Sequence, residues 1–323
     1  MSAALRRAAP VAVVVGVVVG VAAVGAWHLL RSQARVARAA IGKPLGEEGF
    51  QVDRTYRRKR GRPLTLLVLG DSIAAGLGAD RRRRTLGVQL AKRLGKEADR
   101  AVRLVCTAEV GAETWRLAHQ LDALPDDVLP DVTVVVVGGN DVIHRIRLAD
   151  SVAHLAVAVR TLRARGSQVV VGTCPDLGAL QAVPQPLREL GRQASRRLAF
   201  AQREVVVANG GFAVSLAAVV GPIFVDRPEE MFAVDRFHPS GAGYRRTARA
   251  MLPSVLASLG LREDVPVGHH LPLSARGSAE DPDDEAAEVR SPWDTEQRSS
   301  PPGRSCPPTA RGSATGGWAE GRA

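Results

Sequence analysis

The chain has 323 residues, 45% of them hydrophobic and 24% charged, which is enough for one globular domain of about 200 residues with extensions. Its net charge of +11 would suit a nucleic acid or an anionic membrane surface. The basic clusters at 57–60 and 81–84 contain no interleaved aromatic residues and match no nucleic-acid-binding module, so we predict no nucleic-acid partner. Three widely spaced cysteines without a CxxC pair exclude a disulfide scaffold.

An apolar run from Ala8 to Leu30 is long enough to cross a bilayer. Two interpretations are open. Small residues at 24–26 would suit the cleavage site of a signal peptide, whereas Trp27 would suit the interfacial end of a membrane helix. The length favours an uncleaved anchor over residues 1–31, followed by a charged linker over residues 32–62.

Between residues 63 and 260, short apolar runs alternate with stretches of helical spacing. The runs, expected as strands, are 64–69, 102–106, 132–137, 168–172 and 213–216. The helical stretches are 85–94, 114–124, 149–165, 187–208 and 244–259. This alternation predicts an α/β domain with a parallel sheet covered by helices on both faces. Residues 261–323 are rich in Pro, Ser, Gly and charge, which predicts a disordered tail.

Polar signatures follow the first three predicted strands. The first strand leads into Gly70-Asp71-Ser72, the second is followed by Gly111, and the third leads into Gly138-Gly139-Asn140-Asp141. Ligands of open α/β sheets bind beyond the carboxyl ends of the strands. We therefore predict that these signatures meet in one functional site.

Ser72 is a candidate nucleophile, although a serine after a strand is by itself more commonly a helix cap. A hydroxyl needs a base to take its proton. His238 lies in a loop, since Pro239 follows it, and Asp235 precedes it by three residues. Asp235 can accept from one imidazole nitrogen and leave the other for Ser72. Taken alone, an incidental pair on a surface loop would explain Asp235 and His238 equally well.

Asn140 is the third element of the predicted chemistry. Its amide, with the backbone N–H groups of Ser72 and Gly111, would supply three donors to the oxyanion of an acyl-transfer intermediate. The alternative for Asn140 and Gly111 is ordinary turn chemistry. Asp71 and Asp141 are interpreted as structural residues that brace these loops. The histidines form no metal-binding pattern, and no nucleotide-binding glycine motif opens a helix.

Together these blocks resemble the SGNH, or GDSL-type, hydrolase family of esterases and lipases. Gly70-Asp71-Ser72 matches its first block, with Ile73 in place of leucine; 138–141 matches GxND, and 235–238 matches DxxH. The resemblance covers about 200 residues, from Leu64 to Gly260. The second block departs from the family pattern, because Glu109 and Val110 precede Gly111.

The resemblance implies a flavodoxin-like three-layer α/β/α sandwich with a five-stranded parallel sheet in the order 2-1-3-4-5. It implies the catalytic residues Ser72, His238 and Asp235, an oxyanion hole of Ser72, Gly111 and Asn140, and neither metal nor cofactor. Residues 171–177 are also similar to an actinobacterial subgroup of the family, which we expect to be membrane-anchored here.

The predicted function is serine-dependent hydrolysis of acyl esters through an acyl-enzyme on Ser72. The substrate would be a lipid, an acylated sugar or another acyl ester. The same site would also serve an acyltransferase or a carbohydrate O-deacetylase, and a non-catalytic cell-envelope binding protein is a further alternative. We expect an extracytoplasmic domain held by the N-terminal helix, or a secreted protein if that segment is cleaved. The sequence does not indicate the oligomeric state.

Overall fold

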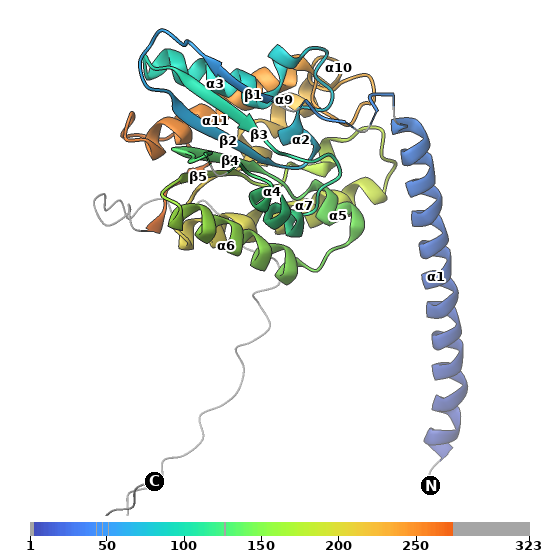
Figure 1. Cartoon of the computed structure of the whole chain (residues 1–323). Coiled ribbons are helices and arrows are strands. Elements are labelled where there is room, and N and C mark those ends of the chain that lie inside the picture. Colours follow the sequence, from blue (N-terminus) through green and yellow to red (C-terminus); the bar gives the residue numbers. More distant parts are fainter. Residues whose placement is uncertain (1–2, 43, 47, 51, 126, 274–323) are drawn as a thin grey trace, which may run out of the picture. The chain divides into compact units, whose positions relative to one another are not determined.

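A computed structural model describes residues 3–273 apart from 43, 47, 51 and 126, with side chains from residue 18 onward. Its centre is a seven-stranded sheet in the order β1-β3-β2-β4-β5-β6-β7 (Figure 1). The strands are β1 (Val52–Tyr56), β2 (Leu64–Gly70), β3 (Val102–Cys106), β4 (Val132–Val136), β5 (Gln168–Gly172), β6 (Phe212–Val214) and β7 (His269–His270). Strands β2 to β6 are mutually parallel, and the two edge strands pair antiparallel. The five parallel strands follow the predicted order and the predicted α/β class is confirmed, but the sheet has seven strands where five were predicted, because an antiparallel strand is added at each edge.

Alternate residues of each central strand face opposite layers, because successive side chains of a strand point to opposite sides. Leu66 and Val68 of β2 belong to a core shared with α3 (Leu86–Glu97) and α11 (Gly241–Ser258). Leu67 and Leu69 belong to a second core on the opposite face. That core is shared with α4 (Leu117–Asp122), α6 (Leu148–Ala164) and α7 (Leu187–Ala208). These two cores make the three layers of the sandwich.

Shorter helices occupy the connections at the carboxyl edge of the sheet. They are α2 (Ser72–Ala75), α5 (Gly139–His144), α8 (Leu216–Val219), α9 (Gly221–Asp226) and α10 (Pro228–Met231), with 3-10 turns η1 (Arg82–Arg84), η2 (Thr114–Arg116) and η3 (Leu177–Ala179). None of these elements is long enough to produce an apolar period in the sequence. Most of them nevertheless carry or border the residues described below.

Two edge strands lie outside the predicted domain boundaries. β1 falls in the predicted linker, where Arg103 of β3 donates two hydrogen bonds to Asp53, at 3.0 and 2.8 Å. Such a half-exposed, charged edge strand has no apolar run to reveal it. β7 falls in the predicted tail and pairs with β6 over two residues, too few for a periodic signal. The disorder predicted beyond it concerns 274–323, which lie outside the described residues.

The apolar run at 8–30 lies within the helix α1 (Ala3–Ile41). Among the described residues, no helix is long and apolar enough to cross a membrane. The predicted anchor over residues 1–31 stays a prediction. The side chains of residues 3–17 are not among those described, and they include the first part of the run, residues 8–17.

Candidate active site

Ser72 is the first residue of α2 and follows β2 with one intervening residue. Asp71 caps the helix by accepting a hydrogen bond from the Ile73 N–H at 2.9 Å. Gly70 has φ +130°, and a Cβ there would lie 1.9 Å from the carbonyl oxygen of Val136, so only glycine allows β2 to end this close to β4. Ser72 is thus presented at the carboxyl edge of the sheet, although its side chain is largely buried.

The loop between α10 and α11 brings a histidine and an aspartate to Ser72. The Ser72 hydroxyl lies 3.0 Å from Nε2 of His238, and Nδ1 of His238 lies 2.6 Å from Oδ2 of Asp235. The other carboxylate oxygen of Asp235 accepts the backbone N–H groups of Phe237 and His238 at 3.0 and 3.1 Å. Arg236, which lies between Asp235 and Phe237, adopts a left-handed conformation with φ +54°. This tight turn folds the carboxylate back onto the imidazole.

Burial and hydrogen bonding act in opposite directions on Asp235. Burial raises its pKa, but the hydrogen bond with His238 and the two backbone N–H groups lower it more, so the pKa lies below its ordinary value. The carboxylate is therefore ionised at neutral pH. An ionised Asp235 fixes the proton of neutral His238 on Nδ1 and leaves Nε2 free to accept from Ser72.

Asn140 lies on α5, and one N–H of its amide donates to the carbonyl oxygen of Ala112 at 3.0 Å. The amide nitrogen carries two hydrogens, so a second N–H remains for a ligand. Asn140 lines the pocket beside Ser72, whereas Gly111 does not. Gly111 has φ +80° and is the neighbour of Ala112. The structure thus brings the predicted Gly111 loop to α5 without placing Gly111 itself in the pocket wall.

Two carboxylates, one predicted as a brace and one not foreseen, fasten this loop to α5. Both oxygens of Asp141 accept the backbone N–H of Thr114, at 3.1 and 3.3 Å. Glu113 accepts from Trp115 Nε1 at 2.6 Å and pairs with Nδ1 of His144 at 2.5 Å. Burial raises the pKa of Glu113, yet these two hydrogen bonds bring it below the ordinary value. The partners are 31 residues apart, so no local pattern could have predicted the pair.

Asp71 has an electrostatic role as well as a capping one. Burial raises its pKa from 3.8 to about 7, although the backbone N–H groups of Ile73 and Gly139 and the nearby His238 oppose this shift. Asp141 raises the pKa further by like-charge repulsion. Asp71 therefore holds a proton over part of the physiological range, directly beside the Ser72 hydroxyl in sequence.

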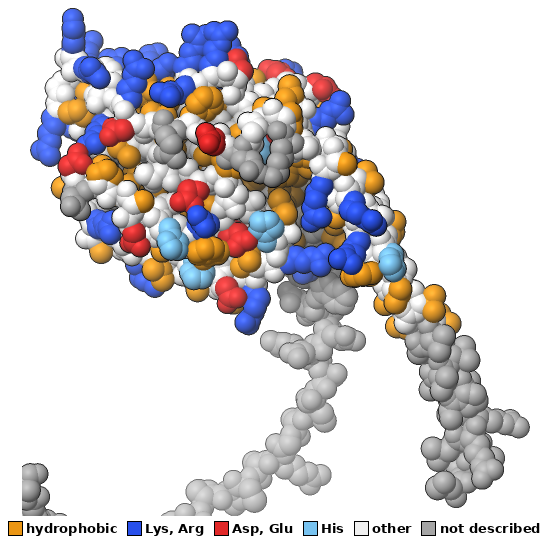
Figure 2. All heavy atoms as spheres, turned by 45° about the vertical axis from the view of Figure 1, so that its right-hand side comes forward, with side chains coloured by type: hydrophobic (Ala, Val, Ile, Leu, Met, Phe, Trp, Pro, Cys, Tyr) orange, Lys and Arg blue, Asp and Glu red, His pale blue; other side chains and the backbone are white. Residues whose placement is uncertain are grey.

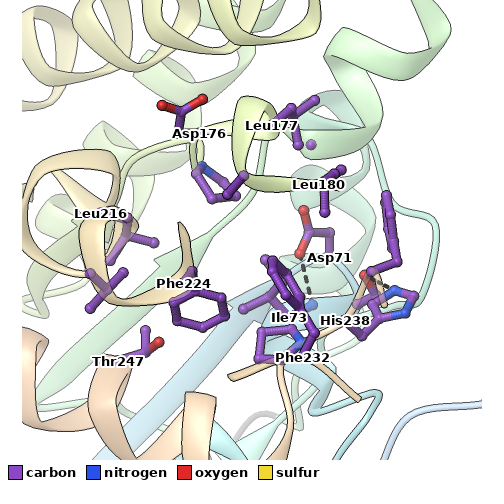
Figure 3. Close-up of a pocket in the computed structure, with 18 of the residues that line it drawn as sticks. Asp71, Ile73, Asp176, Leu177, Leu180, Leu216, Phe224, Phe232, His238 and Thr247 are labelled. Carbon is purple, nitrogen blue, oxygen red and sulfur yellow. Dashed lines mark hydrogen bonds between the residues drawn. The ribbon is translucent and has the colours of Figure 1, made fainter. Parts of the chain in front are cut away.

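An apolar pocket opens beside Ser72 and His238, and its volume is about 770 Å³ including the mouth. Figure 3 shows Leu177 and Leu180 of the η3 region above it, and Leu216 and Phe224 across the pocket from His238. Leu216 and Phe224 are nearly fully buried, so they form its inner end. The lining is predominantly aliphatic and aromatic, and its polar members are Asp71, Ser72, Asn140, Asp176, His238 and Thr247. Such a pocket can hold an acyl chain with its carbonyl carbon near Ser72, and we call it the acyl pocket.

Two other kinds of chemistry for such a site would use a bound metal ion or a cysteine nucleophile. Across the described residues, no three His, Cys, Asp or Glu side chains gather where they could hold a metal ion. Cys106 and Cys174 are both free and buried, and burial raises the pKa of each thiol, so neither is a competing nucleophile.

Comparison with known proteins assigns the chain to a family. Residues 68–246 match the GDSL-like Lipase/Acylhydrolase family. The chain is 37% identical over 267 residues to the GDSL-like esterase Rv1075c of Mycobacterium tuberculosis (strain ATCC 25618 / H37Rv), an alignment that covers 78% of this chain and 83% of that protein.

Solved structures similar to the chain include TesA, with 24% identity, a TM-score of 0.47 and coverage of 60% of this chain and 99% of that one. They also include the acetyl-xylooligosaccharide esterase Axe2 from Geobacillus, with 20% identity, a TM-score of 0.48 and coverage of 62% and 96%. The family match and the esterase relative, together with the fold, establish that the chain belongs to the GDSL-like lipase/acylhydrolase family and is a carboxylic ester hydrolase.

Proposed function

We propose that the chain hydrolyses acyl esters by covalent catalysis on Ser72. The observation that carries this proposal is the continuous hydrogen-bonded relay from Ser72 Oγ through His238 to Asp235, with distances of 3.0 and 2.6 Å. Ser72 Oγ attacks the ester carbonyl carbon while its proton passes to Nε2 of His238. The tetrahedral intermediate then expels the alcohol, which takes that proton, and leaves an acyl-enzyme. Water, deprotonated by the same nitrogen, releases the acid and restores Ser72.

The negative charge on the tetrahedral oxygen needs donors that already point to its position. The remaining N–H of the Asn140 amide is one donor, because the Ala112 carbonyl occupies the other and fixes the orientation of the amide. The backbone N–H of Ser72, at the beginning of α2, is a second donor. The backbone of Gly111 is the third predicted donor. The fastening of its loop to α5 through Asp141 and Thr114 supports that role.

The pocket favours a medium-length acyl chain over an acetyl group. Leu180, Leu216 and Phe224 lie in a space much larger than acetyl requires. Each methylene that leaves water contributes about 0.8 kcal/mol, or roughly a fourfold gain in kcat/KM until the pocket is full. An O-deacetylase would gain nothing from this apolar depth, so lipid-type esters are the better candidates.

The test uses the full chain and p-nitrophenyl esters from acetate to decanoate. We expect kcat/KM to rise along the series before it levels off. We also expect a fluorophosphonate to label wild-type protein and not Ser72→Ala. Asp131→Asn serves as a matched control, because Asp131 accepts the Thr65 N–H at 2.7 Å and is not part of the site. Absence of both turnover and labelling in the wild type would refute covalent catalysis on Ser72.

A further inference from the structure

The basic residues of the chain are unevenly distributed over the domain. Residues 54–100 together with α11 hold 17 Lys and Arg against four Asp and Glu, one of which is the buried Asp71. Residues 107–240 hold 13 basic and 15 acidic residues, so they are nearly neutral. Arg abundance alone would spread positive charge over both parts. The excess therefore belongs to one part of the domain and needs a local explanation.

These basic residues lie on neighbouring elements, and we call the surface that they share the basic face. It consists of the half-buried Arg93 and the exposed Lys and Arg side chains of the β1–β2 connection, η1, α3 and α11: Arg57, Arg58, Lys59, Arg60, Arg62, Arg81, Arg82, Arg83, Arg84, Lys92, Lys96, Arg245, Arg246 and Arg249. Asp99 and Asp80 lie within it and pair with four of its arginines. Figure 2 shows Lys and Arg gathered along the upper edge of the domain, where Figure 1 places α3 and α11. The elements are in contact, since α3 packs on both α11 and η1.

The centre of the basic face holds like charges close together. Burial of Arg93, together with the nearby Arg249 and Arg245, lowers the pKa of its guanidinium. Its Nε is buried and has no hydrogen-bond partner. Like charges held this close repel one another. Anionic groups placed over α3 and α11 would offset that repulsion.

The basic face adjoins the proposed active site. On α11, Thr247 points inward and lines the acyl pocket, while Arg245 and Arg249 are exposed on the outer side. On η1, Arg84 approaches the loop that follows His238, because a Cβ on Gly241 would lie 2.6 Å from the Cδ of Arg84. A negatively charged surface held by these residues would therefore lie next to the pocket.

We infer that the basic face binds the surface of an anionic lipid bilayer and so brings the pocket to acyl esters held in that bilayer. The choice of a lipid partner rests on the proposed function, whereas the charge asymmetry does not. Nucleic acid is disfavoured because the face has no aromatic platform: Tyr244 is fully buried and Tyr56 is half-buried.

The test measures partition of the full chain onto vesicles of phosphatidylcholine with and without phosphatidylglycerol, at low and high salt. We expect tighter partition onto the anionic vesicles, and we expect high salt to weaken it. Arg245→Glu with Arg249→Glu should lower partition about 30-fold or more, because each basic residue near an anionic surface contributes about 1 kcal/mol. Arg165→Glu with Arg197→Glu makes the same charge change on exposed positions of the neutral part, and should have less than about a threefold effect.

Equal partition onto neutral and anionic vesicles, or equal effects of the two double variants, would overturn the inference. So would duplex DNA binding that the Arg245 and Arg249 variant abolishes, if the wild type shows no preference for anionic vesicles. The Arg245 and Arg249 variant should still hydrolyse soluble p-nitrophenyl esters at the wild-type rate. Loss of all turnover in the wild type with intact vesicle binding would refute the esterase mechanism and leave the basic face standing.

Discussion

Replacement of Asp235 by asparagine tests the proposed relay most directly. In the wild type, one oxygen of Asp235 accepts two backbone N–H groups and the other accepts from Nδ1 of His238. The oxygen of the introduced amide must stay on the backbone groups, because its NH2 group would clash with those donors. The NH2 group then faces Nδ1 and donates to it. His238 is forced into the tautomer with its proton on Nε2, which can no longer accept the proton of Ser72.

The expected loss in kcat is about 10⁴-fold, the scale of losing the correct tautomer in such a triad. This corresponds to about 5 kcal/mol of transition-state stabilisation. KM should change much less, because Asp235 is buried and does not line the pocket. Steady-state kinetics with p-nitrophenyl octanoate measure both constants, and thermal unfolding shows whether the variant is folded. A folded variant whose kcat stays within about tenfold of wild type would refute the role assigned to Asp235.

Four further variants test the loops around the relay. Asn140→Ala should lower kcat by about 100- to 1,000-fold in the same assay, because it removes an oxyanion donor; an unchanged kcat would exclude that role. Gly78→Ala should lower both kcat and melting temperature, since a Cβ there would lie 2.5 Å from the Pro239 carbonyl oxygen and 2.9 Å from Cβ of His238. Gly111→Ala, at a similarly positive φ but with open space around it, should show only the backbone strain of about 1–2 kcal/mol in its unfolding free energy. For Asp71, whose pKa of about 7 exceeds the ordinary 3.8, the folded state keeps a proton that the unfolded state loses. Its stabilising contribution is thus present at low pH and is lost as pH rises from about 4 to 7. Urea unfolding of Asp71→Asn across that window should show a flatter pH dependence than wild type; parallel curves would contradict the raised pKa.

The parallel core of the fold could be predicted from local patterns. Each buried strand is a short apolar run, and each covering helix has apolar residues at helical spacing, because burial of one face dictates the period. The same reasoning fails for β1 and β7. β1 is a charged edge strand and β7 has only two residues, so neither produces an apolar pattern in the sequence.

The sequence by itself determined which residues are the candidates for catalysis. Ser72 ends a strand-to-helix turn, and Asp235 and His238 are near enough in the chain for one turn to join them. Only the tertiary structure decided what surrounds them. Residue 238 meets residue 72 across 166 positions because the loop before α11 reaches the carboxyl edge of the sheet, where β2 leads into α2.

The acyl pocket, the pairing of Glu113 with His144 and the basic face likewise depend on packing between distant segments. A local pattern reports the period and turn chemistry of its own segment. It carries no information about which remote segment will lie against it, and that is decided by the order of the strands and the burial of both faces of the sheet.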